Sequence, residues 1–495
     1  MGKTFFNVPK VPMTDKLRLL LNPGLFKKQP IWTKSLTLPK LGEKVYCLSE
    51  KDIGAIRDLR GEIIDLHPGM GGIAPDKLIS MIDRGIELTS LDFMLTKGCN
   101  FECPYCFANS GPAQKEYIPL RILRSVVSEA VDLGTSLFVL TGGEPLIYKD
   151  PELPRQENRG DHFFAVVEMI LNAYGEAGKK AKILTFDDVA LITPEIAKKF
   201  AEYEVGLCAK ADTLIPELQD FKVNQAGAFK RMQRGYKNLM VAGYGKNPNL
   251  NLVVNSVLDQ TTFDGMVDLH IWVMENGFDH SIVPVHYCGS AENEDQEAGI
   301  HSPHVKVLYD LISRIDRKMF GVEWMPWSAF TFNKSCNRNR SGLHIRANGD
   351  VTACSESPGK NETERYTFGN VFSNNFSLRE IVQGPKLYAY RKEFAQGYGI
   401  FVCSPQVCDL YAHNLCQGGC ATRSAYSKID LTTGLVVKNT DSHNYSERRE
   451  DPLCPAWTVL AQRQGILKEG LLGEIHKRLL EKSKRIKPED FPFIP

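Results

Sequence analysis

The chain lacks several features that would place it in a common protein class. No apolar run approaches the roughly 20 residues that a bilayer-spanning helix needs. The formal net charge is only +1, from 60 Lys and Arg against 59 Asp and Glu, so charge gives no reason to expect nucleic acid or an anionic membrane as a partner. The N-terminus, MGKTFFNVPKVPMTDK, has no uninterrupted apolar core followed by a cleavage site. We therefore expect a cytoplasmic protein that binds neither nucleic acid nor membrane.

Cysteine, by contrast, is abundant. The 495 residues include 13 cysteines, an odd number, and most of them lie in tight local clusters. Disulfide scaffolds belong mainly to small secreted chains, whereas clustered thiols in a reducing compartment more often bind metal. The chain is also long enough for two or three domains. We expect its function to lie in the cysteine clusters.

The region 89–302 alternates short apolar runs with longer amphipathic segments. This pattern predicts an α/β fold with a parallel sheet and outer helices, and six strand–helix units suit a partial (β/α)6 barrel. In such a barrel the chemistry lies at the carboxyl ends of the strands. The expected strands are 91–96, 137–141, 181–186, 205–209, 250–258 and 281–287, and the expected helices are 118–133, 162–177, 194–204, 226–243 and 261–276.

The remaining regions are less regular. Residues 1–88 predict an extension with one or two helices and carry no recognisable motif, and 303–335 predict a bridging helix over 303–320. Residues 336–454 are rich in Cys, Gly and Asn, so bound metal is a plausible organiser there. Residues 455–495 predict one or two closing helices and a tail.

The first cysteine cluster follows the first expected strand. Cys99, Cys103 and Cys106 have the spacing C-x3-C-x2-C. A [4Fe–4S] cluster normally takes four thiolates, so three would leave one iron open to a substrate. The alternative is a structural zinc site, but no fourth Cys or His lies at ligand spacing nearby.

This loop resembles that of the radical S-adenosylmethionine (SAM) enzymes, C-x3-C-x-aromatic-C, with Tyr105 at the aromatic position. The resemblance implies a [4Fe–4S] cluster whose open iron chelates the amino and carboxylate groups of SAM. One electron from the cluster then cleaves SAM to methionine and a 5′-deoxyadenosyl radical, which abstracts hydrogen. It also implies a small-protein electron donor of the ferredoxin or flavodoxin type.

A second motif follows the second expected strand. Gly142, Gly143, Glu144 and Pro145 resemble the GGEP segment that binds the amino group of SAM in this superfamily. Two glycines allow close approach of the backbone to a ligand, although Gly-Gly alone usually marks a turn.

Other SAM contacts are expected at the ends of strands four to six. The resemblance points there to Lys210, Asn255, Val285 and His286, and the alternative is that each is an ordinary strand-end residue. The third strand ends in Phe186-Asp187, where many relatives have Thr-Asn-Gly.

The second cysteine field resembles the SPASM domain, an auxiliary-cluster module of radical SAM enzymes. Cys336 precedes a Gly-x4-Cys element from Gly349 to Cys354, and a run C-x4-C-x7-C-x3-C precedes a last cysteine. The usual run is C-x2-C-x5-C-x3-C, so two gaps are longer here. The resemblance implies two auxiliary [4Fe–4S] clusters, and three in total. Cys336, Cys354 and Cys420 would hold the first, and Cys403, Cys408, Cys416 and Cys454 the second.

Some alternatives stay open in this field. The paired cysteines could hold zinc instead of iron. The fourth site of the first auxiliary cluster would be open or filled by a ligand other than cysteine. Of the three remaining cysteines, we expect Cys47 and Cys208 to be buried thiols, whereas Cys288 could face the active site.

The resemblance implies an oxidative modification of a peptide or protein side chain, as in ribosomal peptide maturases. One alternative is a SPASM dehydrogenase of a small molecule such as a sugar, and another is an iron–sulfur electron carrier without chemistry. The sulfatase maturases carry an Asp directly after the Gly-x4-Cys cysteine, where this chain has Ser355 followed by Glu356. Glu356 is a candidate base, or else a solvated loop carboxylate.

Overall fold

The computed structural model describes most of the chain after residue 87. The described residues are 30–38, 44, 47, 88–293, 299–324, 341–356, 366–395, 406–412, 416, 419–438 and 451–493. The helices expected within 1–88 lie outside the described residues.

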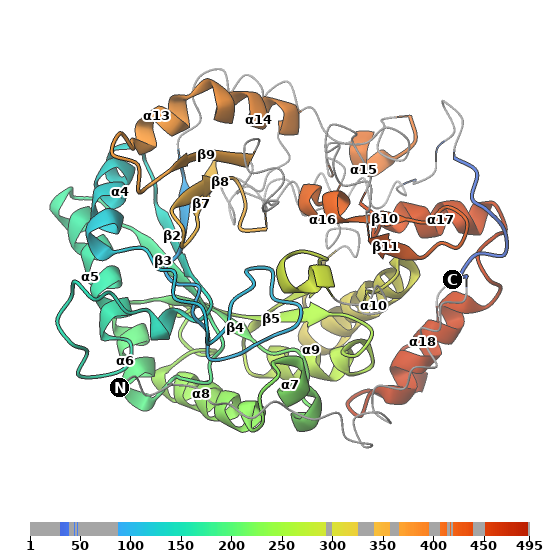
Figure 1. Cartoon of the computed structure of the whole chain (residues 1–495). Coiled ribbons are helices and arrows are strands. Elements are labelled where there is room, and N and C mark those ends of the chain that lie inside the picture. The colour runs from blue at the N-terminus through green and yellow to red at the C-terminus, as the bar shows by residue number, and fades with distance from the viewer. Residues whose placement is uncertain are drawn as a thin grey trace.

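Six parallel strands form the centre of the molecule (Figure 1). They lie side by side in chain order, and β1 and β6 are not paired with each other, so the sheet is open and the predicted partial barrel is confirmed. All five residues of β1 are buried, as expected for a parallel strand covered on both faces. The strands are β1 (Ser90–Met94), β2 (Leu137–Thr141), β3 (Lys182–Asp187), β4 (Gly206–Lys210), β5 (Leu252–Leu258) and β6 (Asp279–Pro284).

Amphipathic helices connect these strands and cover the outside of the sheet (Figure 1). In α6, Thr193 caps the first turn by accepting from the Ile196 amide, and Pro194 occupies the first position. A helix that the sequence did not predict, α7, follows β4 and also begins with proline. The helices are α4 (Leu120–Asp132), α5 (Asp161–Glu176), α6 (Pro194–Glu202), α7 (Pro216–Lys222), α8 (Ala228–Ala242) and α9 (Met266–Glu275).

The sheet continues into the cysteine-rich region. Strand β7 (Gly342–Ile345) pairs in parallel with the free edge of β1, and β8 (Asp350–Thr352) and β9 (Thr367–Asn370) follow in antiparallel order. A turn that contains Gly349, at φ 87°, joins β7 to β8. We expected metal to organise this region, but its first strands are organised by the sheet, because β7 buries Leu343 and Ile345 in the main core.

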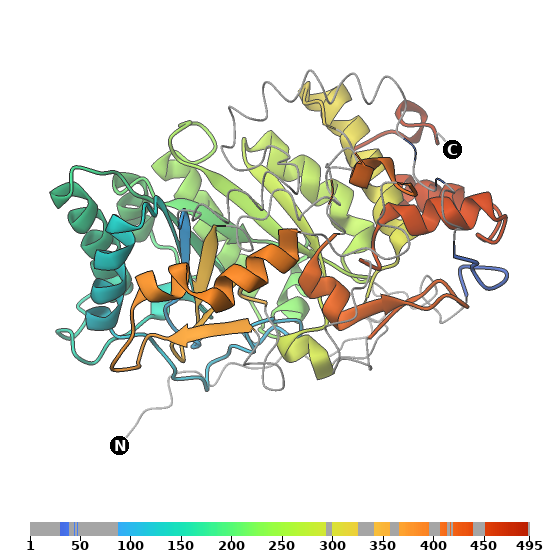
Figure 2. The same ribbon diagram turned by 90° about the horizontal axis from the view of Figure 1, so that it is seen from above.

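Helices close the other end of the molecule. Helix α10 (Ser302–Ile315) continues as one π-helical turn (Asp316–Phe320), and α17 (Pro455–Arg463) and α18 (Leu471–Lys482) pack against α10. The shorter elements are α13 (Leu378–Gln383), α14 (Pro385–Ala395), α15 (Asp409–Ala412), α16 (Ala421–Tyr426), β10 (Ser427–Ile429) and β11 (Val436–Lys438). Figure 2 shows α13 and α14 lying along the sheet strand β9.

A second, smaller core joins distant parts of the sequence. Ile31, Trp32 and Leu36 pack with Val407 and with residues of α17 such as Trp457. Among the described helices, none is long and apolar enough to cross a membrane.

Candidate functional site

The three cysteines of the first cluster lie in a loop that leaves the carboxyl end of β1 and folds back on itself. The Cys99 amide donates to the Gly111 carbonyl at 3.2 Å, and the Cys106 amide donates to the Cys103 carbonyl at 3.2 Å. Burial raises the pKa of Cys99, and the nearby Asp188 and Cys103 raise it further. Burial also raises the pKa of Cys103 to about 12, and the nearby Cys106 adds to this increase. The loop therefore brings the three thiols together. Buried thiolates need a compensating cation, which the irons of a cluster supply.

Segments from both sides hold this loop. A Cβ at Gly143 would lie 2.1 Å from the Gly98 carbonyl oxygen, and one at Gly142 would lie 2.7 Å from that of Thr96. Past β6, a Cβ at Gly289 would lie 2.4 Å from the Cys106 carbonyl oxygen. The two glycines of the GGEP motif are thus required by close approach to the cysteine loop, a reason that the sequence did not show.

Glu144 and Pro145 begin a 3-10 turn, Pro145–Ile147. Glu144 is fully buried, and its carboxylate accepts from the Leu146 amide at 2.9 Å and from the Asp188 amide at 3.0 Å. Glu144 therefore ties the end of β2 to the end of β3.

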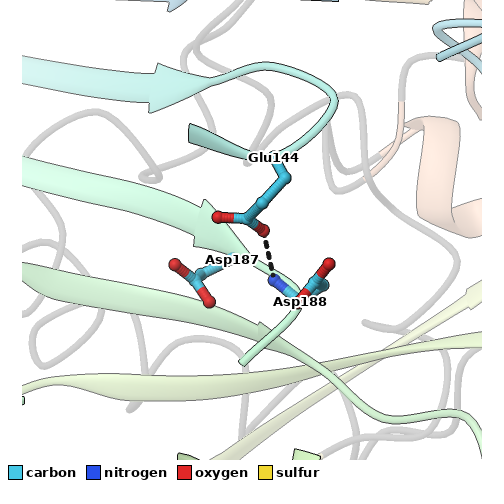
Figure 3. A group of neighbouring side chains, drawn as sticks. All are labelled: Glu144, Asp187 and Asp188. Carbon is cyan, nitrogen blue, oxygen red and sulfur yellow. Dashed lines mark hydrogen bonds between the residues drawn. The ribbon is translucent and has the colours of Figure 1, made fainter. Parts of the chain in front are cut away.

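Glu144, Asp187 and Asp188 form what we call the acidic cluster (Figure 3). One carboxylate oxygen from each lies within 4.8 Å of the others, and all three side chains are buried. Burial and the charge of Asp188 raise the pKa of Asp187 to about 8, and burial raises the pKa of Asp188 to about 6. Burial, followed by the two Asp charges, also raises the pKa of Glu144 well above its usual range.

The acidic cluster has unused hydrogen-bonding capacity. Within the described residues, Asp187 Oδ2 and Asp188 Oδ2 have no hydrogen-bond partner. Buried polar atoms are rarely left in this state, so the cluster is suited to N–H donors or positive charge from a ligand. Asp188 was not predicted from the sequence, where Asp187 stood out only as a departure from the family pattern. Two adjacent Asp at the carboxyl end of a strand were the available signal.

Tyr105 lies in a different charged group, at the ends of β4 and β5. Its hydroxyl donates to Asp212 at 2.7 Å, and Lys210 and Lys222 lie over its ring at 4.6 and 4.2 Å from the centroid. Lys210 also pairs with Asp212 at 2.8 Å, and Lys222 pairs with Asp259. Lys210, predicted to contact SAM, is therefore already paired with a carboxylate in the structure.

Two other predicted SAM contacts lie at neighbouring strand ends. Asn255 is half-buried in β5, and its carbonyl accepts from the Ala211 amide at 3.3 Å. Val285 is buried just after β6, and its amide donates to the Leu258 carbonyl at 2.9 Å. Their contact with SAM stays a prediction.

His286 and Glu356 meet across the join between the barrel and the cysteine-rich region. His286 Nδ1 lies 2.6 Å from Glu356 Oε2. The Glu356 side chain is 23% exposed, so this carboxylate is partly buried as well as paired, and its role as a base stays a prediction. The two residues, predicted separately, form one pair.

The second cysteine field is partly brought together. Burial raises the pKa of Cys454 well above its usual range, and the nearby thiols of Cys408 and Cys416 add to the increase, so three predicted ligands of one cluster lie close together. Cys354 follows β8, and Cys420 precedes α16. Cys336 and Cys403 lie outside the described residues.

A buried ion pair holds the last two ligand-bearing segments together. Arg423 Nε donates to Asp451 Oδ1 at 2.7 Å, and Asp451 Oδ2 accepts from the Cys420 amide at 3.0 Å. Asp451 lies three residues before Cys454, so this network links the two predicted auxiliary sites.

Outside these sites, Cys208 and Cys288 are buried, and the prediction for Cys208 is confirmed. The prediction for Cys47 is wrong, because its thiol is exposed. It lies near the end of α17, 3.5 Å from Arg463 Nη2.

Two family models match the chain. The model described as "Radical SAM superfamily" matches residues 93–255, and the SPASM model, described as "Iron-sulfur cluster-binding domain", matches residues 336–409. The first match contains Cys99, Cys103 and Cys106, and the second contains the first four cysteines of the second field, Cys336, Cys354, Cys403 and Cys408.

Among curated proteins, GTP 3',8-cyclase of Mannheimia succiniciproducens is 28% identical over 199 residues, which are 40% of this chain and 52% of that protein. The radical SAM cyclopropyl synthase TigE of Paramaledivibacter caminithermalis is 24% identical over 207 residues, 38% of this chain and 39% of that protein. The chain spans about half the length of the first curated relatives it matches.

Solved structures share the fold over a longer part of the chain. A structure titled "Native anSMEcpe with bound AdoMet and Cp18Cys peptide" matches with a TM-score of 0.53 and 14% identity, covering 79% of this chain and 99% of that one. SuiB of Streptococcus suis bound to precursor peptide SuiA matches with a TM-score of 0.50 and 14% identity, covering 74% and 79%. Residues 93–255 therefore form a radical SAM domain and residues 336–409 match a SPASM iron–sulfur domain, and the chain shares its fold with these solved structures.

Proposed function

We propose that this enzyme uses a 5′-deoxyadenosyl radical to abstract one hydrogen atom from a peptide or protein side chain. Oxidation of the side chain is then completed when the substrate radical gives its remaining electron to an auxiliary cluster and loses a proton to a base or to solvent. The observation that carries the proposal is that the loop of three cysteines, with Cys99 buried and Cys103 and Cys106 half-buried, lies beside the acidic cluster at the carboxyl end of the parallel sheet. This is where a barrel of parallel strands places its chemistry.

The residues around the loop suit SAM. When bound at Cys99, Cys103 and Cys106, a reduced [4Fe–4S] cluster with one open iron supplies the electron that cleaves SAM. Burial is the main cause of the raised pKa of Cys99. The acidic cluster lies close enough for the charges of Asp188 and Glu144 to raise this pKa further. Its unpaired oxygens can accept N–H bonds from the amino group of SAM, and its negative charge favours the cationic sulfonium.

We propose three [4Fe–4S] clusters, with the ligands implied by the two motifs. The proximity of Cys408, Cys416 and Cys454 supports one auxiliary cluster, and the link from Asp451 to the Cys420 amide supports another beside it. Anaerobic iron and sulfide analysis should give about 12 iron per chain, since each cubane contains four. About four iron together with bound zinc would contradict the auxiliary clusters.

The substrate class is supported by the extent of the similarity. The structures that share the fold over 79% and 74% of this chain include two whose titles name a bound peptide, whereas the sequence matches to GTP 3',8-cyclases of Mannheimia succiniciproducens and Nautilia profundicola cover 40% and 62% of this chain. We therefore favour a peptide or protein over a small molecule. A small-molecule substrate is the second candidate, because several curated relatives that the chain matches are GTP 3',8-cyclases.

The test is reductive cleavage of SAM. Reconstituted protein with dithionite and SAM should release 5′-deoxyadenosine, and Cys99→Ala, Cys103→Ala and Cys106→Ala together should abolish the release while leaving about eight iron in the auxiliary sites. Continued release by the triple variant would contradict the active-site proposal.

A second assay separates the substrate classes. Peptides encoded beside the gene and GTP are each incubated with the active enzyme, and product masses are followed with 5′-deoxyadenosine. A peptide that loses two mass units in step with SAM cleavage supports the proposal. Conversion of GTP without any peptide product would favour the small-molecule class.

A further inference from the structure

His286 is a buried histidine with one ring nitrogen engaged and the other unused. Its side chain is 9% exposed, and Nδ1 lies 2.6 Å from Glu356 Oε2. Nε2 is inaccessible to solvent and has no hydrogen-bond partner within the described part of the chain. Burying an unpaired polar nitrogen is unfavourable, so a ligand that accepts its lone pair would stabilise the site.

The contact with Glu356 determines which nitrogen is available. A carboxylate accepts hydrogen bonds, so Nδ1 donates to Glu356, and in the neutral imidazole Nε2 presents its lone pair. Histidines that bind metal usually have this arrangement, in which a carboxylate holds one nitrogen and the metal binds the other. The contact with Glu356 therefore orients the His286 ring for coordination through Nε2.

The pair also lies beside predicted cluster ligands. Glu356 follows Cys354 by two residues. Burial raises the pKa of Cys420 to about 12, and the Glu356 carboxylate is near enough to raise it further. The resemblance provides three thiolates for the four irons of this auxiliary cluster, so one iron lacks a cysteine ligand.

We propose that His286 Nε2 is a ligand of the auxiliary [4Fe–4S] cluster that Cys354 and Cys420 help to hold, with Glu356 as the residue that orients it. This inference rests on the proposed function, because it takes the auxiliary cluster as given. In this arrangement the iron without a cysteine ligand is bound by a histidine nitrogen from the end of β6. The barrel thereby contributes directly to a site otherwise formed by the SPASM domain.

The test uses the full chain with Cys99, Cys103 and Cys106 replaced by Ala, so that only auxiliary clusters contribute to the spectrum. Protein grown with ¹⁴N- or ¹⁵N-histidine is reconstituted, reduced with dithionite and measured by pulsed EPR. A coordinated imidazole nitrogen should appear, should change with the isotope and should disappear in His286→Gln, with loss of about one iron per chain. The matched control is His280→Gln, a histidine of β6 bonded to Ser256, which should keep the signal.

Two further variants test the roles of the pair. His286→Cys should retain the iron but lower the reduction potential of the cluster, because thiolate in place of imidazole lowers it. Glu356→Gln should keep the nitrogen signal and raise the potential, because the imidazole becomes a weaker donor. A merely structural pair would change neither potential.

The iron content distinguishes the two ways of failing. Full auxiliary iron with a spectrum that does not change with the histidine isotope would overturn the inference and leave the proposed function intact. Loss of one iron in Cys288→Ala, with none lost in His286→Gln, would also overturn it, because the buried thiol of Cys288 would then be the ligand. Absence of auxiliary iron from the otherwise native chain would overturn the proposed clusters themselves.

Discussion

Two groups of buried carboxylates lie at the same edge of the sheet and differ in their partners. The acidic cluster at the ends of β2 and β3 has oxygens without a hydrogen-bond partner in the described residues. At the ends of β4 and β5, Asp212 and Asp259 are paired with Lys210 and Lys222. Buried carboxylates thus lack a cationic partner in the acidic cluster, whereas those at the ends of β4 and β5 are each paired with a lysine.

The difference shows in the protonation of the two groups. Burial raises the pKa of Asp187 to about 8, with Asp188 adding to it. Burial acts on Asp212 in the same direction, but Lys210 and Lys222 outweigh it and lower the pKa of Asp212. A buried carboxylate without a cationic partner is stabilised by a ligand that supplies positive charge or N–H donors. A buried carboxylate already paired with a lysine can instead hold neighbouring residues in place. The first group therefore suits SAM binding, and the second positions Tyr105.

Displacing the acidic cluster and the cysteine loop should have the largest effect on stability and on SAM cleavage. Gly143→Ala would force a Cβ to within 2.1 Å of the Gly98 carbonyl and displace Glu144 and the cysteine loop. We expect a loss of about 3 kcal/mol in unfolding free energy and at least about a 100-fold loss of SAM cleavage, because small displacements of reacting groups are costly. Denaturant unfolding and 5′-deoxyadenosine release measure the two effects.

Gly175→Ala is the matched control, since no atom lies within 4 Å of its Cβ position in α5. It should leave SAM cleavage unchanged and stabilise the protein by about 0.5–1 kcal/mol. Normal cleavage by Gly143→Ala would show that the close approach is not required.

Breaking the second group should destabilise the protein by about 3 kcal/mol. Lys222→Ala leaves Asp259 buried without its cation, and both side chains are at most 5% exposed. Denaturant unfolding measures the loss. Lys198→Ala, which breaks an exposed pair with Glu202, should change stability by less than about 0.5 kcal/mol. Equal changes in unfolding free energy for Lys222→Ala and Lys198→Ala would contradict the structural role given to the buried Lys222–Asp259 pair.

The pH dependence of SAM binding should sharpen the comparison. As pH rises through about 6 and about 8, Asp188 and Asp187 lose their protons, so the cluster becomes more negative and SAM binding should tighten. Asp187→Asn should weaken binding by about tenfold above pH 8, or about 1.4 kcal/mol, and less at pH 6. Anaerobic equilibrium dialysis against labelled SAM measures this.

Asp212 supplies the control for that series. Its lowered pKa keeps it ionised over the same range, so any effect of Asp212→Asn on SAM binding should not vary between about pH 6 and about pH 8. A wild-type affinity that does not change with pH would contradict the proposed role of the acidic cluster.

The smallest effect is expected for Tyr105→Phe. It removes one hydrogen bond to Asp212 but keeps the ring under Lys210 and Lys222, so unfolding free energy should fall by about 1 kcal/mol. SAM cleavage should remain within about threefold of wild type. A larger loss in the folded variant would mean that the hydroxyl, and not the ring, is required.

The sequence predicted the six strands and the order of the motifs because each signal is local. The alternation of apolar runs showed each strand, and the spacing of Cys99, Cys103 and Cys106 lies within one loop. Helix α7 was missed because it is short and lies between β4 and α8 where a loop was expected. The exposure of Cys47 was missed because a lone cysteine carries no local signal for burial.

The sequence by itself determined the fold class, the superfamily and the two cysteine clusters, since residue type and spacing are sufficient for these. Only the tertiary structure decided which distant residues meet. It joined β7 to β1, gathered Glu144 with Asp187 and Asp188, and paired His286 with Glu356, 70 positions away. Such contacts depend on strand register and on which edge of the sheet remains free. No local pattern encodes them, because each requires two segments whose relative position is set by the packing of the whole sheet.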